Sequence, residues 1–184
     1  VELTEPRVRP LGAPAVPPPF DLFRPALTAT LPTQLDHAPV ALRHPTRSAA
    51  LRISAAAVAG FRAALDARDF VEIQTPKIVG SSTESGANVF ALDYFGRPAY
   101  LAQSPQFYKQ MAQVAGFGKI FEIAPAFRAD PSFTSRHATE FTSIDAEISW
   151  IDSHEDVAAM QEELLATAIQ AVKDKHGAEI EELF

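Results

Sequence analysis

Two alternating runs, KIFEIAPAFR at 119–128 and EFTSIDAEISW at 140–150, constrain the fold of this chain more than any other feature. In both runs an apolar residue recurs at nearly every second position, which is the period of a β-strand with one face on a core. Only about ten residues separate the runs, a spacing that favours an antiparallel hairpin with a long loop. The sequence therefore predicts a sheet built around this hairpin.

The two faces of the predicted hairpin differ in chemistry. The face expected to lie on a core carries Phe121, Ile123, Phe127, Ile144, Ala146, Ile148 and Trp150. The opposite face carries Glu122, Arg128, Phe141, Ser143, Asp145 and Glu147. Ion pairs across an exposed sheet face would explain this second set as well as a ligand would, although such pairs stabilise a protein by only about 0–1 kcal/mol each.

The side chains of the polar face are suited to a nucleoside polyphosphate. Arg128 offers a planar donor fork for phosphate or carboxylate, and the ring of Phe141 offers a surface on which a base can stack. The three acids of the face could hold a ligand ammonium group or a divalent metal. In the connecting loop Arg136 and His137 add positive charge, although exposure to water is the simpler interpretation of His137 alone.

A second group of polar residues lies in AQSPQFYKQ, residues 102–110. Ser104 as N-cap and Pro105 at the first helical position predict the start of a helix. Gln106 and Lys109 are three residues apart and share a face of that helix. A lysine in a first turn meets the positive end of the helix dipole, which indicates an anionic ligand, whereas exposure to water explains an isolated lysine equally simply.

The other predicted elements follow from periodicity and from turn residues. They are a helix from Thr46 to about Asp69, a strand in FVEIQTP ending at Pro76, a mobile loop GSSTESGA at 80–87 with Glu84 at its middle, a hairpin in NVFALDYFGRPAYLAQ with its turn at Gly96 and Pro98, and a helix from Ser153 to Gly177 with an apolar stripe.

Composition limits the chemistry and the compartment. The chain has no cysteine, so thiolate nucleophiles and cysteine metal sites are excluded. We find neither an uninterrupted apolar run of about 18 residues nor a signal sequence at the N-terminus, and so expect a cytoplasmic protein without a membrane partner. Ten of the fifteen prolines lie within residues 1–45, which favours an extended linker there.

The net charge of −7 comes from one end of the chain. Residues 151–184 contain nine acids and two lysines, a balance of −7, so the charges of residues 1–150 cancel. The overall acidity therefore does not exclude a nucleic-acid partner.

Taken in order, FVEIQTP, GSSTESGA, YFGRPAYLAQSPQFYKQM and FEIAPAFRAD…SRHATEF…SIDAE resemble the catalytic domain of class II aminoacyl-tRNA synthetases, and most closely the aspartyl-tRNA synthetases of the archaeal type. The resemblance spans residues 40–150. It implies an α+β fold with an antiparallel sheet flanked by helices, incomplete here. Residues 1–30 would end an upstream anticodon-binding domain of the OB type and its linker. Residues 31–184 would form the N-terminal part of the catalytic domain, with motifs 1 and 2 but without motif 3, so we expect this segment alone to be inactive.

The same resemblance implies a reaction and its partners. ATP, with Mg²⁺, would activate L-aspartate to aspartyl-adenylate, and the aspartyl group would pass to tRNA(Asp), or to tRNA(Asn) as well. Motif 1 would form a homodimer.

Residue roles follow from the matched motifs. Arg128 would act in catalysis on the α-phosphate and the substrate carboxylate, and Glu84 with Asp145 would hold the ammonium group. The remaining expected contacts are Gln106 and Lys109 in the amino-acid pocket, Asp130 near the nucleotide, Arg136 and His137 at the outer phosphates, and the Ala138 backbone and Phe141 ring at the adenine. Ser85 and Asp130 depart from the glycine and glutamate usual there.

Two alternatives stay open. One is a synthetase-derived asparagine synthetase that lacks the anticodon domain, and the other is a non-catalytic paralogue that only binds or dimerises. Lys109 favours aspartate over asparagine as the ligand, because a buried ammonium group is better compensated by a carboxylate than by an amide.

Overall fold

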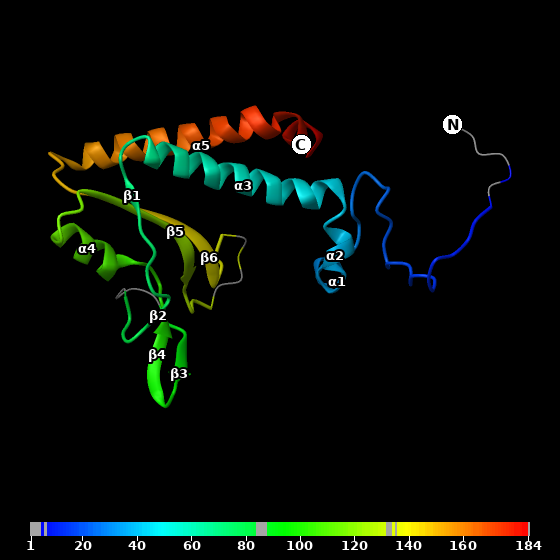
Figure 1. Cartoon of the computed structure of the whole chain (residues 1–184), viewed down its shortest axis with the longest axis horizontal. Helices are drawn as coiled ribbons and strands as arrows, with labels where there is room; N and C mark the ends of the chain where they lie inside the picture. Colours follow the sequence, from blue (N-terminus) through cyan, green and yellow to red (C-terminus); the bar gives the residue numbers. More distant parts are fainter. Residues whose placement is uncertain (1–4, 6, 84–87, 132–133, 135, 184) are drawn as a thin grey trace. The chain divides into compact units, whose positions relative to one another are not determined.

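The computed structural model of the chain describes residues 5, 7–83, 88–131, 134 and 136–183. The chain forms two compact units, residues 1–54 with 178–184 and residues 55–177. Two long helices, α3 (Pro45–Asp66) and α5 (His154–Leu183), each contribute to both units. The elements are labelled in Figure 1.

The first unit contains the short helices α1 (Leu31–Asp36) and α2 (Ala38–Ala41). Neither was expected, because prolines dominate this segment, yet each helix accommodates a proline in its first turn, where no amide donor is needed. His44 is buried and ties this unit together. Its Nδ1 lies 2.8 Å from Thr46 Oγ1 and its Nε2 lies 2.9 Å from the carbonyl oxygen of Arg24. The proline-rich segment is thereby attached to the start of α3.

The second unit is built on a sheet of β1 (Val71–Glu72), β5 (Lys119–Phe127) and β6 (Glu140–Ile148), in the order β1-β5-β6. β5 and β6 are antiparallel, and β1 pairs parallel with β5. In the β5–β6 ladder Glu122 lies opposite Asp145, and Ala126 lies opposite Phe141. The predicted hairpin and its division into two faces are confirmed.

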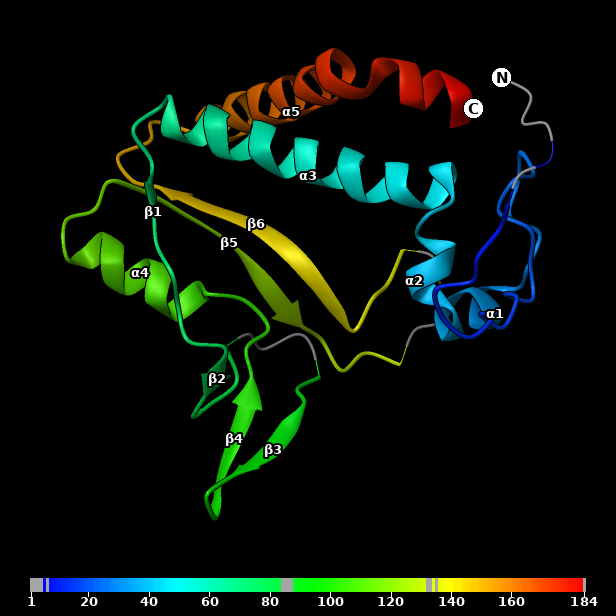
Figure 2. The same cartoon turned by 45° about the vertical axis from the view of Figure 1, so that its right-hand side comes forward.

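The apolar face of this sheet is covered by helices, as Figure 2 shows for α3 and α5. Leu65, Phe70 and Phe121 form the buried centre of the core. Packed against them are Ile123, Ile144, Ala146, Ile148, Met160 and Leu164. The prediction for Trp150 is wrong. β6 ends at Ile148, Trp150 has a left-handed backbone (φ 62°), and its side chain is 96% exposed, because the chain turns away from the sheet there.

Helices α3 and α5 approach each other closely at Gly60. A Cβ atom on Gly60 would lie 2.9 Å from Ala168 Cα and 3.0 Å from Ala171 Cβ. Among the described residues, α3 is the one helix whose length and apolar content would also suffice to cross a membrane, a property that core helices share. Arg62 on α3 donates to Glu72 on β1, and these hydrogen bonds raise the pKa of the Arg62 guanidinium above its usual value.

The second sheet consists of β2 (Ile78–Val79), β4 (Arg97–Leu101) and β3 (Ala91–Tyr94), in the antiparallel order β2-β4-β3. Its hairpin turns at Phe95 and Gly96, with φ of 52° and 79°, which is the two-residue turn that suits strand twist. Pro98 was expected in this turn but lies within β4, opposite Asp93. Proline has no amide hydrogen to donate, and the strand pairing at this position does not require one.

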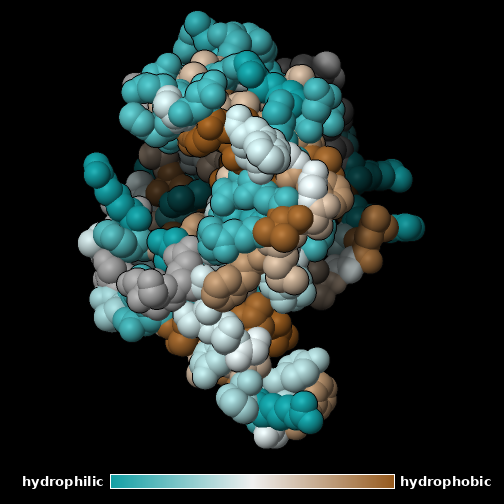
Figure 3. Space-filling model, turned by 90° about the vertical axis from the view of Figure 1, so that its left-hand side faces the viewer, coloured by the Kyte–Doolittle hydropathy of each residue, from teal (hydrophilic) through white to brown (hydrophobic). Residues whose placement is uncertain are grey.

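Helix α4 (Gln106–Val114) lies beside β5, and its side of the molecule is drawn in Figure 3, where hydrophobic patches lie between hydrophilic ones. The helix begins one residue later than predicted, with Pro105 as N-cap, while the Ser104 hydroxyl accepts a hydrogen bond from the Gln106 amide at 3.3 Å. Gly116 ends it with a φ of 102°.

Helix α5 begins as predicted. The Asp156 carboxylate accepts hydrogen bonds from the backbone amides of Asp152 and Ser153, and the Ser153 hydroxyl accepts one from the Glu155 amide. The helix extends beyond Gly177, past a break at His176.

Candidate active site

The base of the polar face holds a buried lysine. Lys109, from α4, is 4% exposed, and its ammonium group bonds Asp145 Oδ1 and lies 3.6 Å from Glu147 Oε2. Gln106 lies one turn earlier on the same helix and is partly buried. The interpretation that Lys109 points to water is therefore wrong, and the structure brings Lys109 and Asp145 together.

Arg128 and Phe141 lie next to each other towards the loop end of the hairpin. The Arg128 guanidinium carbon lies 5.5 Å from the centroid of the Phe141 ring, within the range of a cation–π contact. The backbone amide of Arg128 donates to the carbonyl of Thr139 at 2.9 Å and continues the ladder past the end of β5. A guanidinium fork and an aromatic face thus occupy one place, as strand alternation predicted.

Asp130 is held by the chain that precedes β3. Its Oδ1 accepts a hydrogen bond from the Asn88 amide at 3.3 Å, and the neighbouring Ala129 amide donates to the Asn88 carbonyl at 2.9 Å. Glu84 lies outside the described residues, so its expected role stays a prediction.

Sequence reasoning missed Thr83, which is buried and whose hydroxyl accepts hydrogen bonds from the amides of Gln103 and Ser104 at 3.2 and 3.3 Å. No sequence signal separates this threonine from its polar neighbours. Its bonds attach the start of the 80–87 segment to the chain that leads into α4.

Arg136, His137 and Ala138 are exposed on the loop between β5 and β6. His137 Nδ1 lies 2.6 Å from Thr134 Oγ1, and the amide of Arg136 donates to the same oxygen at 3.3 Å. The structure thus keeps Arg136 and His137 together in the loop that joins β5 to β6.

Glu122 departs from the expected arrangement. It is 1% exposed, and its carboxylate accepts hydrogen bonds from the Thr75 amide at 2.7 Å, the Thr75 hydroxyl at 2.8 Å and the Lys77 ammonium at 2.9 Å to each oxygen. The prediction that it could hold a ligand ammonium group or a metal is wrong, because protein donors already occupy both oxygens. Thr75 and Lys77 were missed, since periodicity does not show which strand lies beside β5.

Within the described part of the chain, no three histidine or acidic side chains gather as metal ligands. The acids of the polar face are bonded to lysines instead, Glu122 to Lys77 and Asp145 to Lys109.

The polar face thus has two buried lysine–carboxylate pairs at one end and an arginine beside an aromatic ring at the other, on a sheet whose opposite face packs against helices. The chain belongs to the family described as tRNA synthetases class II (D, K and N), which matches residues 30–184.

Curated relatives match most of the chain. It is 46% identical over 149 residues to an aspartate–tRNA(Asp/Asn) ligase of Deinococcus radiodurans, covering 81% of this chain and 34% of that protein. It is 42% identical over 184 residues to an aspartate–tRNA(Asp/Asn) ligase of Aeropyrum pernix, covering all of this chain and 41% of that protein. The chain therefore spans well under half the length of these relatives.

Solved structures share the fold. The asparaginyl-tRNA synthetase of Pyrococcus horikoshii complexed with asparaginyl-adenylate superimposes with a TM-score of 0.77 at 33% identity, covering 83% of this chain and 35% of that one. The aspartyl-tRNA synthetase of Entamoeba histolytica superimposes with a TM-score of 0.70 at 33% identity, covering 86% and 29%. These structures confirm the predicted α+β fold of the class II type.

Proposed function

We propose that this chain is part of an aspartate–tRNA ligase, which activates L-aspartate with ATP and transfers the aspartyl group to tRNA. The buried Lys109 carries the proposal, because its ammonium group is fixed on the polar face by Asp145. An ammonium group has three N–H donors, so Lys109 can bond a ligand carboxylate in addition to Asp145 and Glu147, and it has no acceptor for the N–H donors of an amide. The relatives named as aspartate–tRNA ligases support the same assignment.

The first chemical step needs positioning rather than a protein nucleophile. A carboxylate oxygen of aspartate attacks the α-phosphorus of ATP, the bond to the leaving pyrophosphate breaks, and aspartyl-adenylate forms. The protein stabilises the charge that develops at the α-phosphate and holds the reactants in line. Arg128 is the proposed catalytic residue, since one planar fork can donate to the α-phosphate and to the reacting carboxylate together.

The nucleotide is proposed to lie over the loop end of the hairpin. Phe141 would stack on adenine while the Ala138 backbone meets the edge of the base. Arg136 and His137 would reach the outer phosphates, and Asp130 would stand near the nucleotide. The 5.5 Å contact of Arg128 with the Phe141 ring supports this proposal, since base and α-phosphate of one nucleotide require adjacent partners.

The amino acid is proposed to bind at the base of the polar face. Lys109 would receive the side-chain carboxylate of aspartate, with Gln106 on the same helix face as a second contact. Asp145 and Glu84 would hold the ammonium group. The bond from Lys109 to Asp145 supports a shared pocket for these residues.

Magnesium enters the proposal as the ion that accompanies ATP. Glu122 does not fit a divalent cation, because Thr75 and Lys77 already donate to both of its oxygens, and the described residues contain no group of three metal-ligating side chains. This chain's described residues would therefore act on the phosphates through their cationic groups.

The wider setting is also proposed. Residues 1–30 would end an anticodon-binding domain, and residues 31–184 would form part of the catalytic domain. Motif 1, around α3 and β1, would form a homodimer. The enzyme would act in the cytoplasm. One relative, from Caenorhabditis elegans, is named as cytoplasmic. Light scattering of the complete gene product would give the mass of a dimer if the interface is as proposed.

The proposal is tested by ATP–pyrophosphate exchange on the complete gene product, with aspartate and asparagine supplied separately. Aspartate alone should support exchange, and transcripts of tRNA(Asp) should then be charged. Exchange with asparagine alone would identify an asparaginyl enzyme. Aspartate exchange without charging of any tRNA would favour a synthetase-derived asparagine synthetase, and no exchange at all would favour a non-catalytic paralogue. Parallel charging of tRNA(Asn) decides whether both tRNAs are substrates.

A further inference from the structure

Three carboxylates lie together at the base of the polar face. Glu122 stands directly opposite Asp145 in the β5–β6 ladder, and Glu147 lies two residues further along β6. Alternate residues of a strand share a face, and the Cβ atoms of opposite residues are about 5 Å apart. Like charges in such positions destabilise a sheet, so each carboxylate needs a cation close by.

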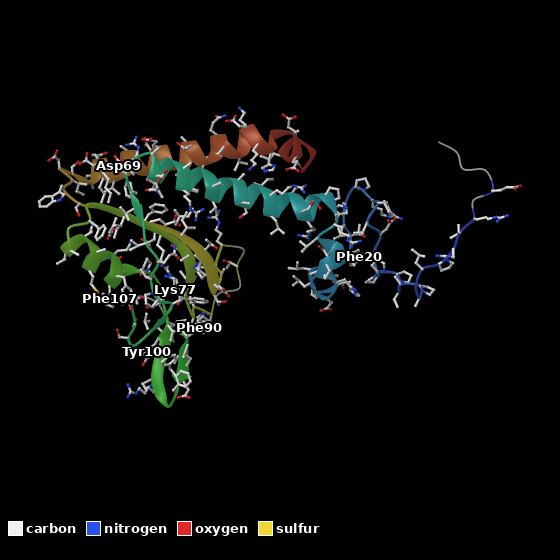
Figure 4. All side chains as sticks on the ribbon, viewed as in Figure 1. Phe20, Asp69, Lys77, Phe90, Tyr100 and Phe107 are labelled. Atoms are coloured by element: carbon white, nitrogen blue, oxygen red, sulfur yellow. The ribbon has the colours of Figure 1, made fainter. Side chains whose placement is uncertain are left out.

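Two lysines from different elements divide these carboxylates between them. Lys109 of α4 bonds Asp145 and lies 3.6 Å from Glu147. Lys77 lies where the chain passes from β1 to β2, as labelled in Figure 4, and its ammonium group lies 2.9 Å from both oxygens of Glu122. Lys109 therefore compensates the carboxylates of β6, and Lys77 compensates the carboxylate of Glu122.

The Lys77–Glu122 pair is locked in place by further bonds. The Thr75 hydroxyl donates to Glu122 and accepts from the Lys77 ammonium at 2.7 Å, and the Thr75 amide donates to the same carboxylate. The Lys77 carbonyl accepts from the Ala102 amide at 2.9 Å. These contacts fix the lysine on Glu122 rather than on the acids of the facing strand.

Burial gives this pairing an electrostatic effect on its neighbours. Glu122 is 1% exposed, so water screens its charge weakly, and a buried carboxylate that loses its counter-charge acts strongly on groups a few ångströms away. The nearest groups across the ladder are Asp145 and the Lys109 bonded to it. Lys77 thus cancels a negative charge that would otherwise reduce the attraction of Lys109 for an anion.

We propose that Lys77 and Glu122 form a charge-balancing pair that sets the preference of the amino-acid pocket for a carboxylate side chain over an amide, without touching the amino acid. The inference rests on the proposed function, in which Lys109 receives the side-chain carboxylate of aspartate. An unbalanced Glu122 repels that carboxylate and leaves the neutral amide of asparagine unaffected. Both residues are positioning residues, since they act through Lys109.

The test uses the complete gene product in ATP–pyrophosphate exchange, with asparagine added as a competitor. Lys77→Met should raise the KM for aspartate about tenfold, through repulsion by the buried charge, and leave the KM for ATP and the inhibition constant of asparagine unchanged. Lys77→Arg keeps the charge and should behave like the wild type. The double variant Lys77→Met/Glu122→Gln removes both charges and should restore the KM for aspartate.

A second single substitution, which removes the negative charge instead of the positive one, tests the inference if the Lys77→Met protein does not fold. Glu122→Gln leaves Lys77 in excess and should lower the KM for aspartate relative to the inhibition constant of asparagine. Arg68→Met, which breaks the exposed pair between Arg68 and Glu163, is the matched control and should change neither constant.

Two results would overturn the inference and leave the proposed function standing. One is a Lys77→Met protein in which aspartate and asparagine weaken equally, and the other is a double variant that does not recover. A wild-type protein without aspartate-dependent exchange would overturn the proposed function, and the inference with it.

Discussion

Both ends of the β5–β6 hairpin carry ionisable side chains, but the base, around Glu122 and Asp145, holds them differently from the tip, the loop that joins the two strands. At the base, Lys109 and Glu122 are 4% and 1% exposed and are bonded to partners from other elements. At the tip, Arg136 and His137 are exposed, and the backbone amide of Arg136 and the ring of His137 bond the Thr134 hydroxyl of their own loop.

This difference has a physical cause. A charge can be buried only when partners compensate its lost hydration, so the geometry of the base is fixed when the protein folds. Charges at the tip keep their water and need no fixed partner. The comparison indicates that the proposed amino-acid pocket is preorganised, while the proposed phosphate contacts depend on exposed charges that salt can screen.

The largest effect is expected from the base. Lys109→Met in the complete gene product should lower aspartate-dependent ATP–pyrophosphate exchange about a thousandfold, because truncating one partner of a buried, hydrogen-bonded charge pair at a binding site costs about 2–5 kcal/mol of binding. Thermal denaturation of the same protein separates loss of function from loss of fold. Exchange within tenfold of the wild type would show that the buried lysine does not select the substrate.

Arg128 stands between the two ends of the face. Arg128→Lys should lower the exchange rate about a hundredfold, because lysine keeps the charge but loses the planar fork that can serve two oxygen ligands at once. Arg97→Lys makes the same substitution on the exposed hairpin of the other sheet and serves as the control. It should leave the exchange rate unchanged. Equal activity of Arg128→Lys would mean that charge alone is required there.

A smaller effect is expected from the aromatic ring. Phe141→Ala should raise the KM for ATP about tenfold, since stacking of a base on an aromatic side chain is worth about 1–3 kcal/mol. Phe141→Tyr keeps the ring and should retain the wild-type value. An increase confined to the KM for aspartate would place the ring beside the amino acid instead.

The smallest effect is expected at the tip. Arg136→Ala should change the KM for ATP only about threefold, because exposed charge pairs contribute about 0–1 kcal/mol. The difference from the wild type should shrink as KCl rises from about 50 to about 500 mM, where the screening length falls to a few ångströms. The Lys109→Met defect should persist at both salt concentrations, and equal salt sensitivity would remove the distinction between base and tip.

Strand alternation predicted the parts of the site that a single hairpin determines. It placed Glu122, Arg128, Phe141 and Asp145 on one face. The β5–β6 register confirms this for the strand residues, and the contact with the Phe141 ring confirms it for Arg128. Turn and cap residues likewise predicted where α4 and α5 begin, to within one residue. These features depend on local geometry, which the order of residue types carries directly.

Features that depend on distant segments could not be predicted in this way. Glu122 looked like a ligand-binding acid, because nothing in its own strand shows that Thr75 and Lys77 lie beside it. Trp150 continued the apolar alternation, but the chain leaves the sheet two residues earlier. The environment of each side chain depends on where its strand ends or on which segment lies beside it. The periodicity of the sequence shows neither the end of a strand nor its neighbour.

The parallel pairing of β1 with β5 has a consequence for the order in which the chain folds. Val71 pairs with Ile120, so this contact must close a long stretch of chain, whereas the β3–β4 and β5–β6 hairpins join neighbouring segments. Contacts between distant residues form more slowly than local ones, because more chain entropy is lost before any contact compensates for it. We therefore expect both hairpins to form early and β1 to dock late. Until it docks, Glu122 faces its neighbours without Thr75 and Lys77, so the docking of β1 also completes the charge balance of the proposed pocket.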